Sequence, residues 1–310
     1  MIDVAARDAR AHAHAVSVSS ALGRERDVVL SGGRVRYREI GSGEPLVFVH
    51  GVFCNGDLWR KVVPILARDC RCIVPDWPLG SHYPPFAKDA DLTPTGVAAL
   101  ILDFVDALGL EQPTLIGNDT GGAFVQLAAA AAPERLARIV LTSCDAFENF
   151  PPVALRLPAK LGYLPRAMFL LGQLLRPRRV QRLMYRWSTK GDLPDDVCDS
   201  YARHGLRHPA VVRDLARVLR ELHPRYTLAA AEALRRFDRP ALVAWADDDR
   251  FFPPDDGRRL AGLMPHARFE LVEDSRTFIP EDQPERLASL IREFVAEHPL
   301  EHAGIVAQGG

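Results

Sequence analysis

The stretch Leu115-Ile116-Gly117-Asn118-Asp119-Thr120-Gly121-Gly122 decides how this chain folds. An apolar run over 113–116 and a helical pattern over 123–128 flank the turn, so the sequence predicts a strand, a tight turn and a helix with Asp119 at the apex. Glycines at 117 and 121 relieve the crowding of such a turn. The helix N-terminus favours an ionised carboxylate, which can attack carbon and form an ester. An equally open interpretation is that Asp119 only caps the helix.

Length and composition describe a globular chain with no polyanionic partner. Its 310 residues suffice for one large α/β domain, or for a domain with an insert. The hydrophobic content of 47% and the charged content of 25% are ordinary for globular proteins. A formal net charge of −1 gives no reason to expect nucleic acid or a membrane as partner. No apolar stretch approaches the roughly 18 residues of a spanning helix.

The cysteines and the N-terminus favour a cytoplasmic location. Five cysteines without paired spacing suit a reducing compartment better than a disulfide framework. Residues 1–20 contain Asp3 and Asp8 and lack the apolar segment of a signal peptide. Cys70 and Cys72 should face opposite sides of a strand, so no metal site is expected there.

The order of strands and helices predicts an α/β core interrupted by a helical insert. An Ala-, Ser- and Arg-rich segment over 1–25 is expected to form a mobile arm. We expect the core over 26–146 and 238–298, because strands and helices alternate there. Between them, 147–237 is helical and punctuated by prolines, as in a cap over the active-site face, and 299–310 is a tail. The alternation predicts a mainly parallel sheet with ligands at the C-terminal ends of its strands.

Three local patterns in the core predict a hairpin, a helix and the N-cap of a second helix. Two strands within 27–40 are joined by the turn Ser31-Gly32-Gly33 and predict a hairpin. The segment 58–67 predicts one helix, and Thr93 predicts the N-cap of a second helix that runs to Leu108.

Three motifs stand in a fixed order along roughly residues 26–298. They are His50-Gly51 after one strand, Gly117-x-Asp119-x-Gly121-Gly122 after another, and Trp245-Ala246-Asp247-Asp248-Asp249 near the end. Together they resemble the α/β-hydrolase superfamily, in which the turn between strand and helix that carries the nucleophile is called the nucleophile elbow. An aspartate at this elbow, here Asp119, resembles the haloalkane dehalogenase and epoxide hydrolase branch. The resemblance implies an α/β fold with a mostly parallel central sheet flanked by helices and an inserted helical cap. It also implies that Asp119 attacks a substrate carbon, and that a histidine activated by an acid then directs water onto the resulting ester.

The resemblance assigns the oxyanion hole and part of the substrate pocket. The backbone N–H groups of Thr120 and of Val52 or Phe53 match the oxyanion-hole positions. Trp59 matches the tryptophan that opens the helix after the His-Gly loop in many relatives.

The acid that would activate the histidine has two candidates. Asp249 matches the acid after the late strand, although Asp247 and Asp248 leave the register open by a residue or two. Asp145 is the second candidate, because some branches place the acid after the preceding strand. Either residue can instead turn a loop or cap a helix.

The loop over 274–284 departs from the family pattern. Relatives carry the catalytic histidine in a loop that reads roughly Asp-x-x-His-Phe-x-x-x-Glu-x-Pro, and Phe278 and Pro284 align this loop so that Thr277 occupies the histidine position. A threonine hydroxyl is not a general base near neutral pH, and losing such a base typically costs a factor of roughly 10² to 10⁴. Val52 and Thr120 also stand where haloalkane dehalogenases commonly have Asn and Trp, so dehalogenation of simple haloalkanes is not expected.

Other side chains could complete the site. His82 lies in a loop on the ligand-binding edge and is a candidate for a relocated base, or a loop histidine bonded to backbone. Phe147 and Phe150 are candidates for the substrate pocket together with Thr277, or for the core of the cap. The arginines of 176–186 predict the solvated face of a cap helix.

Three hypotheses for function follow. The first is a hydrolase of a small, largely apolar substrate that is epoxide-, ester- or halide-like, with Asp119 as nucleophile and a non-standard base. The second is a lyase, isomerase or cyclase in which Asp119 acts as acid or base. The third is a catalytically silent ligand-binding relative. No metal or organic cofactor, no nucleic acid and no membrane is expected as a partner, and a homodimer is left open.

Overall fold

The computed structural model describes residues 18–202 and 208–300, and residues 1–17 of the predicted arm and 301–310 of the predicted tail lie outside them. An eight-stranded sheet forms the centre, in the order β1-β2-β4-β3-β5-β6-β7-β8. β1 pairs with β2, and β2 with β4, antiparallel, and every other neighbouring pair is parallel, which confirms the predicted α/β fold class. The strands are β1 (Arg24–Leu30), β2 (Gly33–Ile40), β3 (Glu44–Val49), β4 (Cys70–Pro75), β5 (Thr114–Asp119), β6 (Arg138–Cys144), β7 (Ala241–Ala246) and β8 (Ala267–Val272).

The topology brings two of the sequence motifs to one crevice. From β3 the chain moves to β4 on one side and then crosses back to β5 on the other. In an open α/β sheet, ligands bind outside the C-terminal ends of the strands at such a reversal. β3 ends at Val49, just before His50-Gly51, and β5 ends at Asp119, so the two motifs are neighbours.

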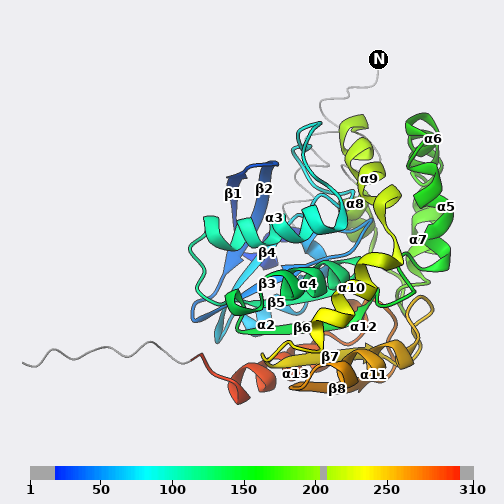
Figure 1. Ribbon diagram of the computed structural model, residues 1–310. Helices are drawn as coiled ribbons and strands as arrows, with labels where there is room; N and C mark the ends of the chain where they lie inside the picture. Colours follow the sequence, from blue (N-terminus) through cyan, green and yellow to red (C-terminus); the bar gives the residue numbers. More distant parts are fainter. Residues whose placement is uncertain (1–17, 203–207, 301–310) are drawn as a thin grey trace, which may run out of the picture.

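Helices cover both faces of the sheet (Figure 1). The α-helices are α2 (Val63–Leu66), α3 (Pro94–Ala107), α4 (Thr120–Ala131), α5 (Val153–Leu161), α6 (Pro165–Leu174), α7 (Arg178–Tyr185), α8 (Asp195–Ala202), α9 (Pro209–Glu221), α10 (Pro224–Leu234), α11 (Pro254–Leu263), α12 (Ile279–Asp282) and α13 (Pro284–Glu297). The 3₁₀ helices are η1 (Ser20–Leu22), η2 (Gly56–Trp59) and η3 (Pro133–Arg135). Helices α3, α4, α10 and α11 contribute to one hydrophobic core, and α2 and α13 contribute to the other.

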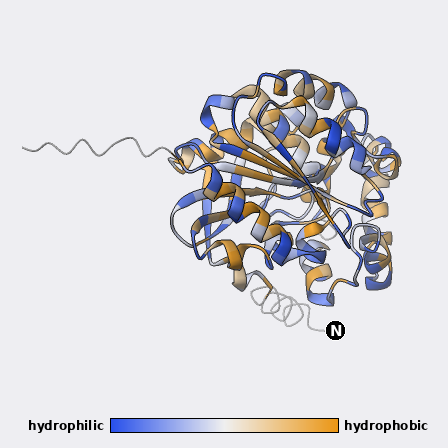
Figure 2. Cartoon of the chain, turned by 90° about the horizontal axis from the view of Figure 1, so that it is seen from below, coloured by the Kyte–Doolittle hydropathy of each residue, from blue (hydrophilic) through white to orange (hydrophobic). Residues whose placement is uncertain are grey.

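Alternation along the strands divides their side chains between the two cores. In β3, Val47 and Val49 belong to the core that contains α4, whereas Leu46 and Phe48 belong to the core that contains α13. Successive side chains of a strand point to opposite faces, so a strand covered on both sides is apolar throughout. Figure 2 shows the result: largely hydrophobic strands lie between helices whose outward faces are hydrophilic.

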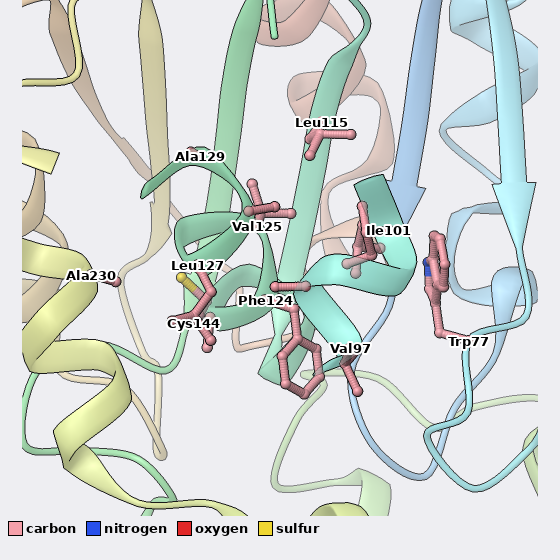
Figure 3. Packing of buried hydrophobic residues seen from close by; sticks show 14 of the residues in the cluster. Trp77, Val97, Ile101, Leu115, Phe124, Val125, Leu127, Ala129, Cys144 and Ala230 are labelled. Atoms are coloured by element: carbon pink, nitrogen blue, oxygen red, sulfur yellow. The ribbon is translucent and has the colours of Figure 1, made fainter. Parts of the chain in front are cut away.

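The layer between α3, α4 and the sheet is densely filled. Figure 3 shows side chains of α3, α4 and β5 in this layer, among them Val97, Phe124 and Leu115. Thr93 caps α3 through its side chain, which accepts a hydrogen bond from the N–H of Gly96, as the sequence predicts. This packing fixes α4, and with it the turn that carries Asp119.

The predicted cap segment, 147–237, is helical where it is described, from α5 to α10. Helices α5 and α6 pack against α9 rather than against the sheet. Helix α10 differs, because it packs against α4 and α11 in the core layer. The predicted segment therefore consists of a cap, α5 to α9, and one helix that belongs to the core packing.

Two predicted local boundaries are wrong. The helix expected over 58–67 is broken into η2 and α2, because Pro64 has no N–H to continue the helical ladder. The arm expected over 1–25 is partly ordered: Leu22 is fully buried, and β1 begins at Arg24. The apolar side chain of Leu22 joins the core that contains α13, where burial outweighs the polar composition around it.

Two further expectations concern a membrane-spanning helix and the cellular compartment. No helix among the described residues is both long and apolar enough to cross a membrane. The five cysteines, Cys54, Cys70, Cys72, Cys144 and Cys198, are free thiols and buried. The cytoplasmic location stays a prediction.

Close backbone contact at the elbow requires glycine. A Cβ on Gly121 would lie 2.4 Å from the carbonyl oxygen of Val49 and 2.5 Å from that of His50, so α4 starts directly against the end of β3. These neighbours are backbone atoms, which cannot rotate away as a side chain would.

We therefore expect Gly121→Ala to destabilise the protein by about 1–3 kcal/mol through overpacking. Chemical denaturation measures this change, with Gly262→Ala as the matched control. Gly262 lies in α11, and a Cβ there would meet nothing within 4 Å among the described residues. Alanine at this position should therefore be neutral or stabilise by up to about 1 kcal/mol. Equal effects of the two substitutions would contradict the close contact.

Candidate active site

Asp119 stands where β5 turns into α4. Its backbone angles, φ 55° and ψ −135°, lie in a region that residues other than glycine rarely adopt. A strained turn between strand and helix is the geometry that presents a nucleophile in this type of fold. Asp119 occupies the N-cap position of α4, but its side chain makes no capping hydrogen bond. Capping therefore does not account for the aspartate.

The loop after β3 lies directly against the Asp119 carboxyl. A Cβ on Gly51 would lie 2.0 Å from Oδ2 of Asp119 and 2.5 Å from its Cγ, so only glycine leaves room for the carboxyl. The N–H of Thr120 lies near this carboxyl and lowers its pKa. The N–H of Phe53 already donates to the carbonyl oxygen of Leu79 at 3.0 Å. Of the two alternatives for the second oxyanion donor, this favours Val52.

Thr277 contacts the acid that a catalytic histidine would contact. Its Oγ1 donates to Oδ1 of Asp249 at 2.8 Å. The same oxygen accepts the N–H groups of Phe251 and Phe252, each at 2.9 Å. Oδ2 of Asp249 is buried without a hydrogen-bond partner among the described residues. Thr277 therefore hydrogen-bonds to one of the two acid candidates, and its place as the substitute for a histidine stays a prediction.

The neighbouring aspartates of the same loop face elsewhere. Asp248 forms ion pairs with Lys190 at 3.0 Å and Arg276 at 3.1 Å, which lower its pKa. Asp247 accepts the N–H of Ser275 at 3.0 Å. Within the run of three aspartates, Asp249 is the residue that hydrogen-bonds to Thr277.

Asp145 is the third buried carboxyl of the site. It follows β6, is completely buried, and neither of its carboxylate oxygens has a hydrogen-bond partner within the described part of the chain. Burial raises its pKa well above the ordinary value, and the nearby charge of Asp119 raises it further. The structure therefore brings both acid candidates, Asp145 and Asp249, close to Asp119.

Burial and like charge determine the protonation of Asp119. Desolvation raises its pKa, repulsion from Asp249 adds to this, and the N–H of Thr120 opposes it, with a resulting pKa of about 8. At pH 7 such a group is ionised in about a tenth of the molecules. Asp119 can thus hold a proton near neutrality, and its ionised fraction can act as a nucleophile.

His50 does not supply the missing base. Its Nδ1 lies 2.8 Å from the carbonyl oxygen of Gly51, and its Nε2 accepts the N–H of Trp77 at 2.9 Å. Burial lowers its pKa to about 4, so the ring is neutral and is held by backbone groups on both sides.

His82, the predicted relocated base, is buried beside an acid of the cap. Its Nε2 lies 3.3 Å from Oδ2 of Asp214 in α9, and its Nδ1 has no hydrogen-bond partner among the described residues. A charge on His82 affects the pKa of His50, so the two rings are close. His82 is not among the groups that shift the pKa of Asp119. A role for His82 as base stays a prediction.

An apolar hollow lies between the cap and the loop after β3. It is small, with a cavity volume of about 20 Å³, and is partly open to solvent. The described residues that line it are Phe53, Gly80, Leu175, Gln181, Met184, Tyr185, Tyr201, Ala202 and Leu215. The hydroxyl of Tyr185 donates to the carbonyl oxygen of Phe53 at 2.6 Å, which ties α7 to the loop beside Asp119.

Three aromatic residues predicted for the substrate pocket serve packing instead of lining this hollow. Trp59 is fully buried, with its ring 5.0 Å from that of Phe48. Phe147 lies under the guanidinium of Arg259, 3.8 Å from the ring centre, and Phe150 is fully buried. Large aromatic side chains supply much of the apolar area of a core, so sequence alone does not separate packing from binding.

Asn118 is a positioning residue that sequence reasoning missed. Its Nδ2 donates to the carbonyl oxygen of Thr277 at 2.7 Å and to Oγ1 of Thr142 at 3.0 Å. It thereby joins the loop of Thr277 to β5 and β6. The sequence did contain a signal, because Asn118 is a polar residue within an apolar strand. Such a side chain, which is fully buried here, must find hydrogen-bond partners.

Comparison with known proteins agrees with this geometry. The family model described as the alpha/beta hydrolase fold matches residues 44–284. A 2-hydroxymuconate semialdehyde hydrolase from a Pseudomonas species is 28% identical over 281 residues, which cover 88% of this chain and 94% of that protein. Haloalkane dehalogenase 2 from Mycobacterium bovis is 27% identical over 280 residues, which cover 85% of this chain and 92% of that protein.

A solved structure confirms the fold. The crystal structure of an alpha/beta hydrolase fold protein from Burkholderia ambifaria superimposes with a TM-score of 0.74 at 23% identity, covering 86% of this chain and 97% of that one. The likeness is one of fold.

The pKa of Asp119 predicts how stability depends on pH. The folded protein holds this proton up to a pH of about 8, whereas the unfolded chain releases it near the ordinary value of 3.8. Between these values the folded state binds more protons, so the free energy of unfolding falls as the pH rises. Asp119→Asn removes this loss and should stabilise the protein at pH 9, on the order of a few kcal/mol, with a smaller gain at pH 5.

Thermal unfolding at pH 5, 7 and 9 measures this dependence. Asp248→Asn is the matched control, because ion pairs lower the pKa of Asp248 and its removal should bring no gain at high pH. A stability difference between Asp119→Asn and the wild type that does not change with pH would contradict the raised pKa.

Proposed function

Because the chain belongs to the α/β-hydrolase fold family, we propose that Asp119 is the reacting group of an enzyme for a small, largely apolar substrate. The observation that carries the proposal is the position of its carboxyl, at a strained elbow and against the backbone of Gly51. The apolar hollow beside the same loop supports an apolar substrate.

The first step of the proposed reaction is covalent. The ionised carboxylate attacks an electrophilic carbon of the substrate, and a C–X or C–O bond breaks. A halide leaves with the bonding electron pair, whereas the oxygen of an opened epoxide keeps the pair, stays on the substrate and takes up a proton from water. The product is an alkyl ester of Asp119 from a halide and a hydroxyalkyl ester from an epoxide. The N–H groups of Val52 and Thr120 are the proposed donors that stabilise negative charge on the ester carbonyl oxygen.

The second step is the one for which the site lacks a standard base. Water must lose a proton as it attacks the ester, and Thr277 cannot accept that proton near neutral pH. Oδ1 of Asp249, beside Thr277, accepts three hydrogen bonds, from the Thr277 hydroxyl and from the N–H groups of Phe251 and Phe252. Its Oδ2 has no hydrogen-bond partner among the described residues. We infer that the ester persists unless a base from elsewhere in the chain, for which His82 is the candidate, activates water for hydrolysis.

A second candidate function rests on the raised pKa of Asp119. A carboxyl with a pKa of about 8 exchanges its proton near neutral pH, which suits general acid–base catalysis. Such a site would serve a lyase, isomerase or cyclase, and no water would need to be activated. The three buried carboxyls, Asp119, Asp145 and Asp249, favour this alternative because they keep at least one proton within the site.

The first prediction from this proposal is a trapped ester. After incubation, the intact mass should increase by the alkyl group of an alkyl halide or by the whole mass of an epoxide, and peptide mapping should place the adduct on Asp119. The ionised form reacts, so labelling should accelerate as the pH rises from 6 to 9, with a midpoint near the pKa of about 8.

Asp119→Ala is the control for site specificity, and Asp145→Ala is the control for a second buried carboxyl. An adduct that persists in Asp119→Ala would contradict the assignment. Absence of both adduct and released alcohol would exclude the covalent step and favour proton transfer.

The second prediction concerns the missing base. Thr277→His places an imidazole beside Asp249, whose Oδ2 can orient it. Release of the trapped ester should accelerate by roughly 10² to 10⁴. Thr277→Ser, which keeps the hydroxyl on Asp249, should leave release unchanged. If both variants release the ester equally slowly, a missing base is not the limiting defect.

A further inference from the structure

The cap contains a long segment of a single charge sign. Residues 149–191 include no aspartate or glutamate. Over the same range there are nine basic residues: Arg156, Lys160, Arg166, Arg176, Arg178, Arg179, Arg182, Arg186 and Lys190. The net charge of −1 for the whole chain conceals this local excess.

The same segment carries most of the exposed large apolar side chains. Ten of the fourteen among the described residues lie within it: Val153, Leu157, Tyr163, Leu164, Phe169, Leu170, Leu174, Val180, Leu183 and Trp187. Leu174 and Val153 are 70% and 72% exposed. Single apolar residues on a surface are normal, but a cluster of this kind marks an interaction site.

Helices α5, α6 and α7, which carry seven of these ten residues, lie at one edge of the molecule (Figure 1). Inner faces of α5 and α6 pack against α9, and Met168 of α6 is buried there. Their outer faces combine apolar and basic residues, such as Leu157 beside Lys160 in α5 and Leu170 beside Arg166 in α6. We call this outer surface of α5, α6 and α7 the cap face.

The basic residues of the cap face are of two kinds. Arg178 and Arg182 form ion pairs with acidic residues of α8. Arg156, Lys160 and Arg166 are exposed and form no ion pair with any described residue. The second group leaves positive charge available among the exposed leucines.

Charge decides which partner fits the cap face. A second copy would bring the same unpaired positive charges together without acidic residues of α5 to α7 to oppose them, which is unfavourable. An anionic partner is complementary. Leucine and aromatic side chains spread over three helices match a fluid apolar layer beneath anionic headgroups, because helices with a basic and an apolar character bind in that interface.

We propose that the cap face binds the surface of an anionic lipid bilayer. The apolar side chains enter the boundary between headgroups and acyl chains, and Arg156, Lys160 and Arg166 contact the phosphates. This proposal departs from the expectation of no membrane partner, which rested on the charge averaged over the chain. Binding of this type lies in the plane of the surface and needs no spanning helix.

The cap face also borders the apolar hollow. Leu175 follows α6, and Met184 and Tyr185 lie on α7, and all three line the hollow. A bilayer bound at the cap face would therefore lie near this small hollow.

Co-sedimentation with vesicles tests the proposal on the full chain. Vesicles of equal parts phosphatidylglycerol and phosphatidylcholine should bind the protein, and pure phosphatidylcholine vesicles should bind it far more weakly. Added salt should weaken binding, because it screens the charges. The triple variant Arg156→Gln/Lys160→Gln/Arg166→Gln should lose about fivefold in affinity per charge, about a hundredfold in total.

Matched controls separate the cap face from general charge and hydrophobicity. Arg24→Gln/Arg68→Gln/Arg292→Gln removes three exposed arginines elsewhere and should leave vesicle binding nearly unchanged. Leu174→Ser should weaken binding about tenfold, whereas Val29→Ser, at the same 70% exposure on β1, should not.

Three results would overturn the proposal. The first is no binding to anionic vesicles, and the second is equal binding to neutral ones. The third is a dimer, measured by sedimentation velocity without lipid, that Leu174→Ser dissociates, because the cap face would then be the contact between two copies. Circular dichroism of each variant establishes that the fold is retained.

Discussion

The contact between the end of β3 and the start of α4 is the constraint on which the site depends. Gly121 lies against the carbonyl groups of Val49 and His50, and Gly51 lies against the carboxyl of Asp119. Both contacts exclude a Cβ, so the two strand ends approach as closely as their backbones allow. This approach holds Asp119 at its strained backbone angles.

The same enclosure explains the electrostatics. Three carboxyls, Asp119, Asp145 and Asp249, are brought together away from water, and none of the causes that set their pKa values is a nearby cation. Desolvation raises all three pKa values, and repulsion from a neighbouring carboxylate adds to it for Asp119 and Asp145. Thr277 donates one neutral hydrogen bond to Asp249 and brings no positive charge to the three carboxyls.

The cap combines two environments. Its inner side packs on α9 and lines the hollow next to Phe53, while its outer side carries exposed leucines and unpaired basic residues. A helix that must bury one face and expose the other normally has a polar outer face. The outer faces of α5 and α6 do not follow this pattern, and the membrane-surface proposal gives them a physical role.

The sequence by itself determined the fold class and the turn between strand and helix at Asp119, because these follow from periodicity, glycine spacing and motif order. It did not distinguish the surroundings of Asp145 from those of Asp249, or aromatic residues that line the hollow from aromatic residues packed in the core, such as Trp59. Those distinctions depend on contacts between residues far apart in the chain. Only the tertiary structure decided them, since burial, hydrogen bonding and the pKa of Asp119 arise from strands and loops that meet in space.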